Sequence, residues 1–142
     1  MGVFQRGVSI YTSINDTYMQ CATSRRTYLD LELKKASYVW ELKGHGGSVK
    51  SNATFNLEEG EAVDTLNYYI DNDRTHVYTC HFFYTDYNTC VVLEMSFQGH
   101  NQCTLWVKPA VVDHVPGHCR KNYKKKCSVR FPTYDREQCK VN

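Results

Sequence analysis

The fold is decided at residues 76–95, which read His76-Val-Tyr-Thr-Cys80-His-Phe-Phe-Tyr84-Thr-Asp-Tyr-Asn-Thr-Cys90-Val-Val-Leu-Glu-Met95. Two runs rich in β-branched and aromatic residues, 75–84 and 90–97, flank the polar sequence Thr85-Asp-Tyr-Asn88. Such runs favour β-strands, and a polar turn between them predicts an antiparallel hairpin. A further β-type run follows at 103–107. The centre of the chain therefore predicts antiparallel β-structure.

Shorter alternating runs precede this hairpin. At 27–34, Leu29, Leu31 and Leu33 fall on one face of a predicted strand, and the short connection at 34–36 predicts a hairpin into the next run. Turn sequences separate the remaining runs, at 8–20, 37–42, 53–57 and 66–70. About eight short strands at hairpin spacing predict an up-and-down barrel or a sandwich.

One helix is predicted, over about 117–127. Pro116 stands near its first turn, where proline is favoured, and Lys124-Lys125-Lys126 stands near its end, where cations suit the helix dipole. We interpret the lysine run as a solvated helix face. The tail after it, with Pro132, Tyr134 and Cys139, is expected to be extended.

Length and composition indicate one folded domain over residues 1–142. The chain is 42% apolar and contains 11 Tyr, 6 Phe and 2 Trp, which argues against disorder. A net charge of +2 gives no field that would attract nucleic acid or an anionic membrane. No apolar run is long enough for a membrane-spanning helix. No apolar leader opens the sequence, so we expect a secretion signal to have been removed or to lie outside it.

Seven cysteines without a Cys-x-x-Cys pair argue for disulfides rather than for a zinc or thioredoxin-like site. Two sequons, Asn15-Asp-Thr17 and Asn52-Ala-Thr54, are candidate glycosylation sites. Both features predict a secreted, extracellular protein. The sequence alone leaves the pairing open, because any six cysteines allow about 15 connectivities.

No catalytic or metal-binding pattern emerges from the sequence. Of the six histidines, only His114 and His118 stand four apart, and Pro116 lies between them. The sequence Gly44-His-Gly-Gly47 lacks the pattern of a phosphate-binding loop. We therefore expect no enzyme, no cofactor and no metal.

Five features in one order carry a resemblance to a known family: Tyr18-Met-Gln-Cys21, Tyr84-Thr-Asp-Tyr87 before Cys90, Cys103-Thr-Leu-Trp106-Val, Val115-Pro-x-x-Cys119 with Cys127 eight residues on, and Tyr134-Asp-x-x-Gln-Cys139. In these the chain resembles the tick salivary lipocalins, the histamine-binding protein family. The resemblance implies an all-β fold: an eight-stranded antiparallel lipocalin barrel, stabilised by disulfides, with one C-terminal helix on its side and a cavity for a small molecule.

The resemblance also implies a disulfide pairing. Carried over by position, it pairs Cys21 with Cys139, Cys90 with Cys119, and Cys103 with Cys127. Cys80 is left over, and we interpret it as a buried strand residue rather than a reactive thiol.

Family members that bind biogenic amines carry an acidic residue directly after the cysteine that matches Cys90 and another directly before the Leu-Trp pair. Val91 and Thr104 occupy these positions here. A buried ammonium group needs a carboxylate or a cage of aromatic faces. The departure therefore favours an apolar ligand over an amine.

The predicted ligand-binding residues come from the β-type runs. If Val91 points inward as the resemblance implies, strand alternation brings Leu93 and Met95 with it, and Thr104 brings Trp106. Ordinary packing of a small barrel is the alternative for these side chains. Aromatic walls and one carboxylate complete the set: Tyr38, Trp40, Tyr69, Tyr78, Phe82, Tyr84 and Glu41.

Other charged residues offer alternatives. Glu32 and Glu94 join Glu41 as candidate partners for an amine, although solvated positions are more common for glutamate. Glu94 falls on the strand face opposite Val91. Three arginines, Arg25, Arg26 and Arg74, are candidates for holding the carboxylate of a fatty-acid-like ligand.

The resemblance implies a secreted salivary protein, a monomer, that sequesters small host inflammatory mediators and so evades host defence. Residue evidence favours a lipid or other apolar mediator, whereas the family favours histamine or serotonin. A second alternative is a decoy that binds a host protein, such as complement or a receptor, through its loops on an inert barrel.

Overall fold

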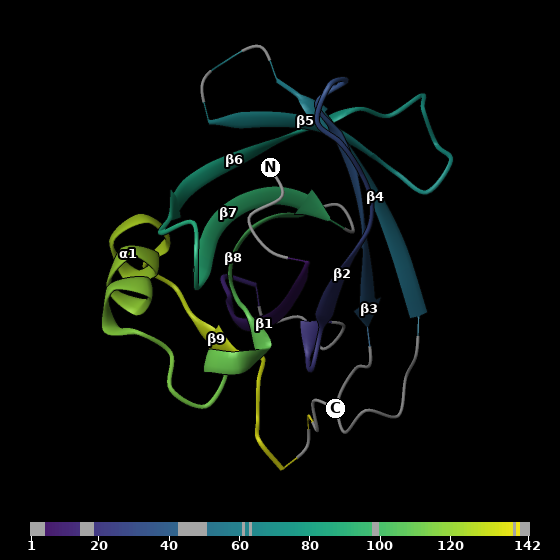
Figure 1. The fold of residues 1–142 in the computed structure, drawn as a ribbon. Coiled ribbons are helices and arrows are strands. Elements are labelled where there is room, and N and C mark those ends of the chain that lie inside the picture. The colour runs from purple at the N-terminus through teal and green to yellow at the C-terminus, as the bar shows by residue number, and fades with distance from the viewer. Residues whose placement is uncertain are drawn as a thin grey trace.

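The computed structural model describes residues 5–14, 19–42, 51–60, 62, 64–97, 100–137 and 139. Antiparallel strands dominate it (Figure 1). They are β1 (Arg6–Thr12), β2 (Thr23–Asp30), β3 (Lys35–Leu42), β4 (Ser51–Glu59), β5 (Thr65–Ile70), β6 (Tyr78–Thr85), β7 (Cys90–Phe97), β8 (His100–Val107) and β9 (Phe131–Pro132). The 3₁₀ helix η3 (Pro109–Val111) and the α-helix α1 (Gly117–Cys127) lie between β8 and β9.

Eight strands close into a barrel. Each strand from β2 to β7 pairs with the next, β8 pairs with β1, and β1 pairs with β2 to complete the circle. The β1–β2 seam is short, with Arg6, Gly7 and Val8 opposite Arg25, Ser24 and Thr23. The two-residue strand β9 adds to the later part of β1. The predicted eight-stranded antiparallel barrel is confirmed.

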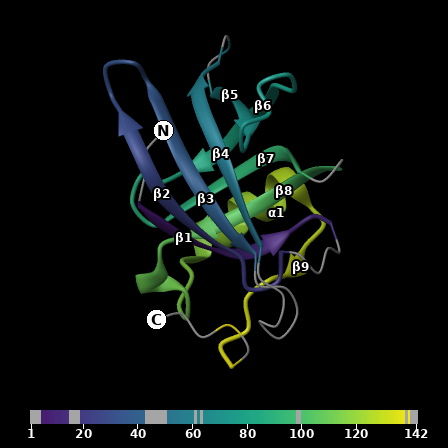
Figure 2. The same cartoon turned by 90° about the vertical axis from the view of Figure 1, so that its right-hand side faces the viewer.

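Helix α1 lies against the outside of the barrel, on β6, β7 and β8 (Figure 2). Its buried residues are Cys119, Tyr123 and Cys127, which recur every four residues and so form one stripe along the helix. Ser128, at a φ of 54°, ends the helix. The helix boundaries agree with the prediction. None of the helices in the described part of the chain has the length and apolar character that crossing a bilayer requires.

Three disulfides join the barrel to the helix and the tail. They are Cys21–Cys139, Cys90–Cys119 and Cys103–Cys127, the pairing that the resemblance implied. Two of them fasten α1 to the starting residue of β7 and to β8. Cys80 is free and buried, as expected.

Two apolar clusters share the barrel wall because successive residues of a strand face opposite sides. The first fills the interior and includes Trp40, Phe55, Tyr68, Met95 and Trp106. The second lies between the outer face of β7 and β8 and the helix, and includes Val92, Cys103, Leu105, Val107 and Tyr123. Strands β7 and β8 are therefore covered on both faces.

The predicted strand at 27–34 is shifted in the structure. Strand β2 begins at Thr23 and ends at Asp30, and Leu31 and Leu33 lie in the turn that follows, with exposed fractions of 75% and 62%. The Asp30 carboxylate accepts the Leu33 N–H at 3.0 Å, and Lys34 adopts a φ of 54°. Local turn bonds thus outweigh the alternation of the leucines, and the hairpin turn comes at 31–34 rather than at 34–36.

Strand β6 starts three residues later than the run at 75–84 predicts. The Asp73 carboxylate accepts hydrogen bonds from the Thr75 N–H, at 3.1 Å, and hydroxyl, and its Oδ2 lies 2.9 Å from His76 Nδ1. These bonds fold residues 73–76 into a loop, so the strand begins only at Tyr78.

Candidate functional site

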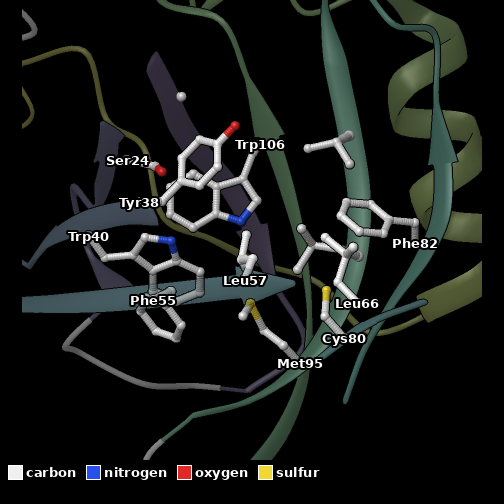
Figure 3. A pocket seen from close by; sticks show the side chains of 13 residues that line it. Ser24, Tyr38, Trp40, Phe55, Leu57, Leu66, Cys80, Phe82, Met95 and Trp106 are labelled. Carbon is white, nitrogen blue, oxygen red and sulfur yellow. The ribbon is translucent and has the colours of Figure 1, made fainter. Parts of the chain in front are cut away.

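The barrel interior contains a cavity of about 90 Å³ (Figure 3). It exceeds the roughly 10–15 Å³ that one water needs, and it is smaller than the roughly 300–1,000 Å³ of most ligand pockets. All strands from β1 to β8 contribute to its wall. The lining residues are Gly7, Ser24, Tyr38, Trp40, Phe55, Leu57, Leu66, Cys80, Phe82, Val91, Leu93, Met95 and Trp106.

Aromatic rings form one side of the cavity. The Trp40 ring centroid lies 4.2 Å from that of Phe55 and 4.8 Å from that of Trp106. The Trp106 indole N–H donates to the Thr104 hydroxyl at 2.8 Å, and both residues are buried. Thr104 therefore holds the Trp106 ring in place rather than lining the cavity itself.

The described residues that line the cavity include no charged side chain. Val91 lines the cavity at a position where the resemblance implies an acid in amine binders, and the Thr104 hydroxyl accepts the Trp106 indole N–H. An ammonium group buried here would have no counter-ion and only aromatic faces, such as those of Trp40, Phe55 and Trp106, beside it. The lining therefore offers apolar burial and aromatic faces but no charged partner.

Strand alternation places part of the predicted set on the cavity. Seven of its members line it: Tyr38, Trp40, Phe82, Val91, Leu93, Met95 and Trp106. Ligand binding by these residues stays a prediction. The other five, Tyr69, Tyr78, Tyr84, Thr104 and Glu41, lie elsewhere.

A register shift explains Tyr84. The pairing of β6 with β7 is irregular between Phe82 and Tyr84, so these two side chains point to opposite faces of the sheet. Phe82 lines the cavity, whereas Phe83 and Tyr84 pack against the outer cluster beneath the helix. The Tyr84 ring meets the His118 ring edge-on, with centroids 6.2 Å apart.

Two more tyrosines of the set also lie away from the cavity. Tyr69 neighbours the buried Tyr68 in β5, and the Arg74 guanidinium lies 5.0 Å from its ring. Tyr78 packs against the interior cluster, with its ring centroid 5.4 Å from that of Tyr68, yet it is not among the lining residues.

The candidate carboxylates do not reach the cavity. Glu41 lies beside Trp40 in β3, and its side chain, 40% exposed, pairs with Arg25 at 3.3 Å. Glu94 lies opposite Cys103 in the β7–β8 pairing, on the face that carries the outer cluster. Glu32 is exposed in the β2–β3 turn. Among the described lining residues there is also no arginine.

Six lining residues were absent from the predicted set: Gly7, Ser24, Phe55, Leu57, Leu66 and Cys80. Alternation within β4 and β5 contained the signal for Phe55, Leu57 and Leu66. No sequence pattern marked Gly7 and Ser24, because these residues meet only where the barrel closes between β1 and β2. Burial, and to a lesser degree the charge of Glu94, raises the pKa of the Cys80 thiol to about 12, so it lines the cavity as a neutral group.

A wider groove of about 660 Å³ opens at one end of the barrel. The β2–β3 turn, the β4–β5 connection and β6 contribute Leu31, Lys34, Asp64, Phe83 and Tyr84 among others. Leu66 and Phe82 line both the groove and the inner cavity, so these two side chains separate them.

A cluster of potential metal ligands lies at the helix start, where the side chains of Asp86, Cys90, His118 and Cys119 gather. The two cysteines form a disulfide, so their thiolates are not available to a metal. Asp86 Oδ2 instead lies 2.8 Å from His118 Nε2 and ties the β6–β7 turn to α1. Partial burial alone would raise the pKa of Asp86, but bonds from His118, Thr89 and backbone N–H groups outweigh it and lower the pKa.

The predicted glycosylation sites differ in what the structure describes. Asn52 is exposed on β4, and Asn15 lies outside the described residues. Glycosylation at either position stays a prediction.

A closed eight-stranded barrel with an interior cavity and a helix on its flank defines the lipocalin class of small-molecule-binding proteins. A profile of the tick histamine-binding protein family matches residues 9–141. The chain therefore belongs to this family. No curated protein matches the chain in sequence.

Solved structures share the fold at low identity. Japanin from Rhipicephalus appendiculatus, bound to cholesterol, has a TM-score of 0.68 and 14% identity, over 93% of this chain and 94% of that chain. AM182 in complex with serotonin has a TM-score of 0.68 and 16% identity, over 94% and 84%. Lobster apocrustacyanin A1 has a TM-score of 0.66 and 11% identity, over 94% and 78%.

Proposed function

We propose that the protein is a secreted salivary lipocalin that captures a small, uncharged, largely apolar mediator of the host in its barrel. The observation that carries this proposal is the cavity lining: Thr104 is bonded to Trp106, and no described lining residue is charged. Val91 lines the cavity at a position where the family resemblance implies an acid in amine binders. Capture by apolar burial with one or two polar contacts needs no catalytic group. Host defence evasion by sequestration follows from such capture.

The size of the cavity limits the ligand. At about 90 Å³, it suits a compact molecule, and a sterol or a long lipid would require side chains to move. Family membership favours an amine such as histamine or serotonin instead. Glu32, Glu41 and Glu94 lie away from the cavity, which argues against compensation by these carboxylates.

Native mass spectrometry tests the proposal, with and without denaturation, followed by titration with histamine, serotonin, cholesterol and leukotriene B4. Trp40 and Trp106 both line the cavity and are the chain's 2 tryptophans, so their fluorescence reports occupancy. We expect a retained or titratable apolar ligand and amine binding at least about tenfold weaker, the equivalent of roughly 1.4 kcal/mol.

A matched pair of variants locates the binding. Val91→Phe fills the cavity and should abolish binding, whereas Val39→Phe enlarges a side chain that is not among the cavity-lining residues and should leave binding unchanged. Submicromolar histamine or serotonin binding would contradict the apolar ligand. Absence of every ligand, together with capture of a host protein, would favour the decoy function instead.

A further inference from the structure

The amide of Gln102 is a buried polar group with an unused donor. Gln102 is 1% exposed and alternates with Thr104 and Trp106 along β8, so it lies on the inner face of the barrel. The Thr12 hydroxyl donates to its Oε1 at 2.9 Å. Its Nε2 is buried and has no hydrogen-bond partner among the residues that the structure describes.

The hydrogen bond with Thr12 engages the carbonyl end of the Gln102 amide. The Thr12 hydroxyl donates to Gln102 Oε1 at 2.9 Å and is approached by the Ile14 N–H at 3.5 Å. With the carbonyl oxygen engaged in this way, the NH₂ group is left without an acceptor among the described residues. Buried donors without acceptors are rare in folded proteins, and each calls for a physical explanation.

Met95 connects this amide to the ligand cavity. It lies directly opposite Gln102 in the pairing of β7 with β8, and paired residues project from the same face of a sheet. Met95 also lines the cavity (Figure 3). Because methionine is unbranched and adapts its shape readily, a rotation of Met95 would extend the cavity toward Gln102.

We propose that Gln102 is the polar recognition point of the ligand site, reached past Met95. The ligand class is a narrow apolar molecule that carries a carbonyl or hydroxyl oxygen at its inner end, where this oxygen accepts from Gln102 Nε2. Because the cavity of about 90 Å³ suits only a compact molecule, this ligand needs the space that the rotation of Met95 opens. A protonated amine has only donors to offer to an NH₂ group and is disfavoured. This inference rests on the proposed function and specifies its ligand.

Three probes of equal chain length test the proposal: 2-decanone, 1-decanol and decylamine. Binding is followed by the fluorescence of Trp40 and Trp106. Gln102→Leu, which keeps the size but removes the donor, should weaken 2-decanone and 1-decanol by about three- to tenfold. Gln5→Leu, at an exposed position, is the control and should change nothing.

Two further variants separate recognition from packing. Gln102→Glu replaces the donor with an acceptor and should reverse the preference, so that decylamine binds more tightly than 2-decanone. Met95→Ala, which opens the route, should strengthen 2-decanone binding only while Gln102 is present. If Gln102→Leu loses the native circular dichroism spectrum, Gln102→Asn, whose amide is shorter by one methylene, carries the same expectation of weaker binding.

Unchanged affinity for the ketone and the alcohol in a folded Gln102 variant would overturn this inference and leave the proposed function intact. Failure of the wild-type protein to bind these probes and every mediator tested above would instead overturn the proposed function.

Discussion

Replacing Thr104 with valine probes the bond that sets the shape of the cavity wall. The change removes the acceptor of the Trp106 indole N–H, which is bonded at 2.8 Å. Valine matches threonine in shape, so the change removes little packing. Thr104 is 0% exposed and Trp106 is 3% exposed, so water can replace the lost acceptor only from the cavity side. A buried donor left without its partner costs about 1–3 kcal/mol.

We therefore expect Thr104→Val to lower the free energy of unfolding by about 1–2 kcal/mol and the melting temperature by about 3–10 °C. Urea unfolding followed by circular dichroism measures the first quantity, and the tryptophan emission of the folded protein should shift to the blue. Thr27→Val is the control, because the Thr27 hydroxyl makes an exposed 3.4 Å contact with the Ser37 carbonyl. Wild-type stability and unshifted emission in Thr104→Val would refute the idea that Thr104 holds Trp106.

Three other perturbations have defined outcomes. Val91→Asp, which restores a family acid, should strengthen histamine binding by at least about tenfold in calorimetry, the equivalent of roughly 1.4 kcal/mol, and should lower stability without ligand; unchanged affinity would show that position 91 does not contact the amine. Cys80, whose pKa is raised to about 12, should resist iodoacetamide at pH 8 in the folded protein and gain one adduct only after denaturation, as read by mass spectrometry. Asp86→Asn removes the carboxylate that pairs with His118 and should destabilise the protein at pH 7. The expected loss is only about 1 kcal/mol, because His118 is exposed and water weakens the pair. Because folding lowers the pKa of Asp86, its stabilisation is complete above about pH 4 and fades as the pH falls further, so unfolding curves of variant and wild type should converge in acid.

Strand identity was readable wherever alternation agreed with tertiary pairing. The boundaries of β7 and α1 agree with their sequence patterns, because both elements bury a regular stripe. The alternation of Leu31 and Leu33 predicted too long a strand. The Asp30 carboxylate accepts the Leu33 N–H and starts a turn, so the strand ends before it reaches these leucines. Alternation alone carries no information on such side-chain bonds.

The candidate site was predicted in part, for related reasons. Val91, Leu93, Met95 and Trp106 follow from the period of two along β7 and β8. Tyr84 does not follow, because the irregular pairing in β6 turns it to the outer face, and a bulge leaves no period in the sequence. Glu41 pairs with Arg25 on the neighbouring strand, a contact that depends on register.

The sequence by itself determined the β-rich class, the order of the strands, the single helix and, through its resemblance to a family, the disulfide pairing. These properties depend on local periodicity, on turn residues and on a motif order that is visible along the chain. The tertiary structure decided which side chains share the interior, how small the cavity is, and that Gln102 has a donor to spare. Such properties arise only when strands far apart in the chain meet, because closure of the barrel and the register between strands set the distances among their side chains.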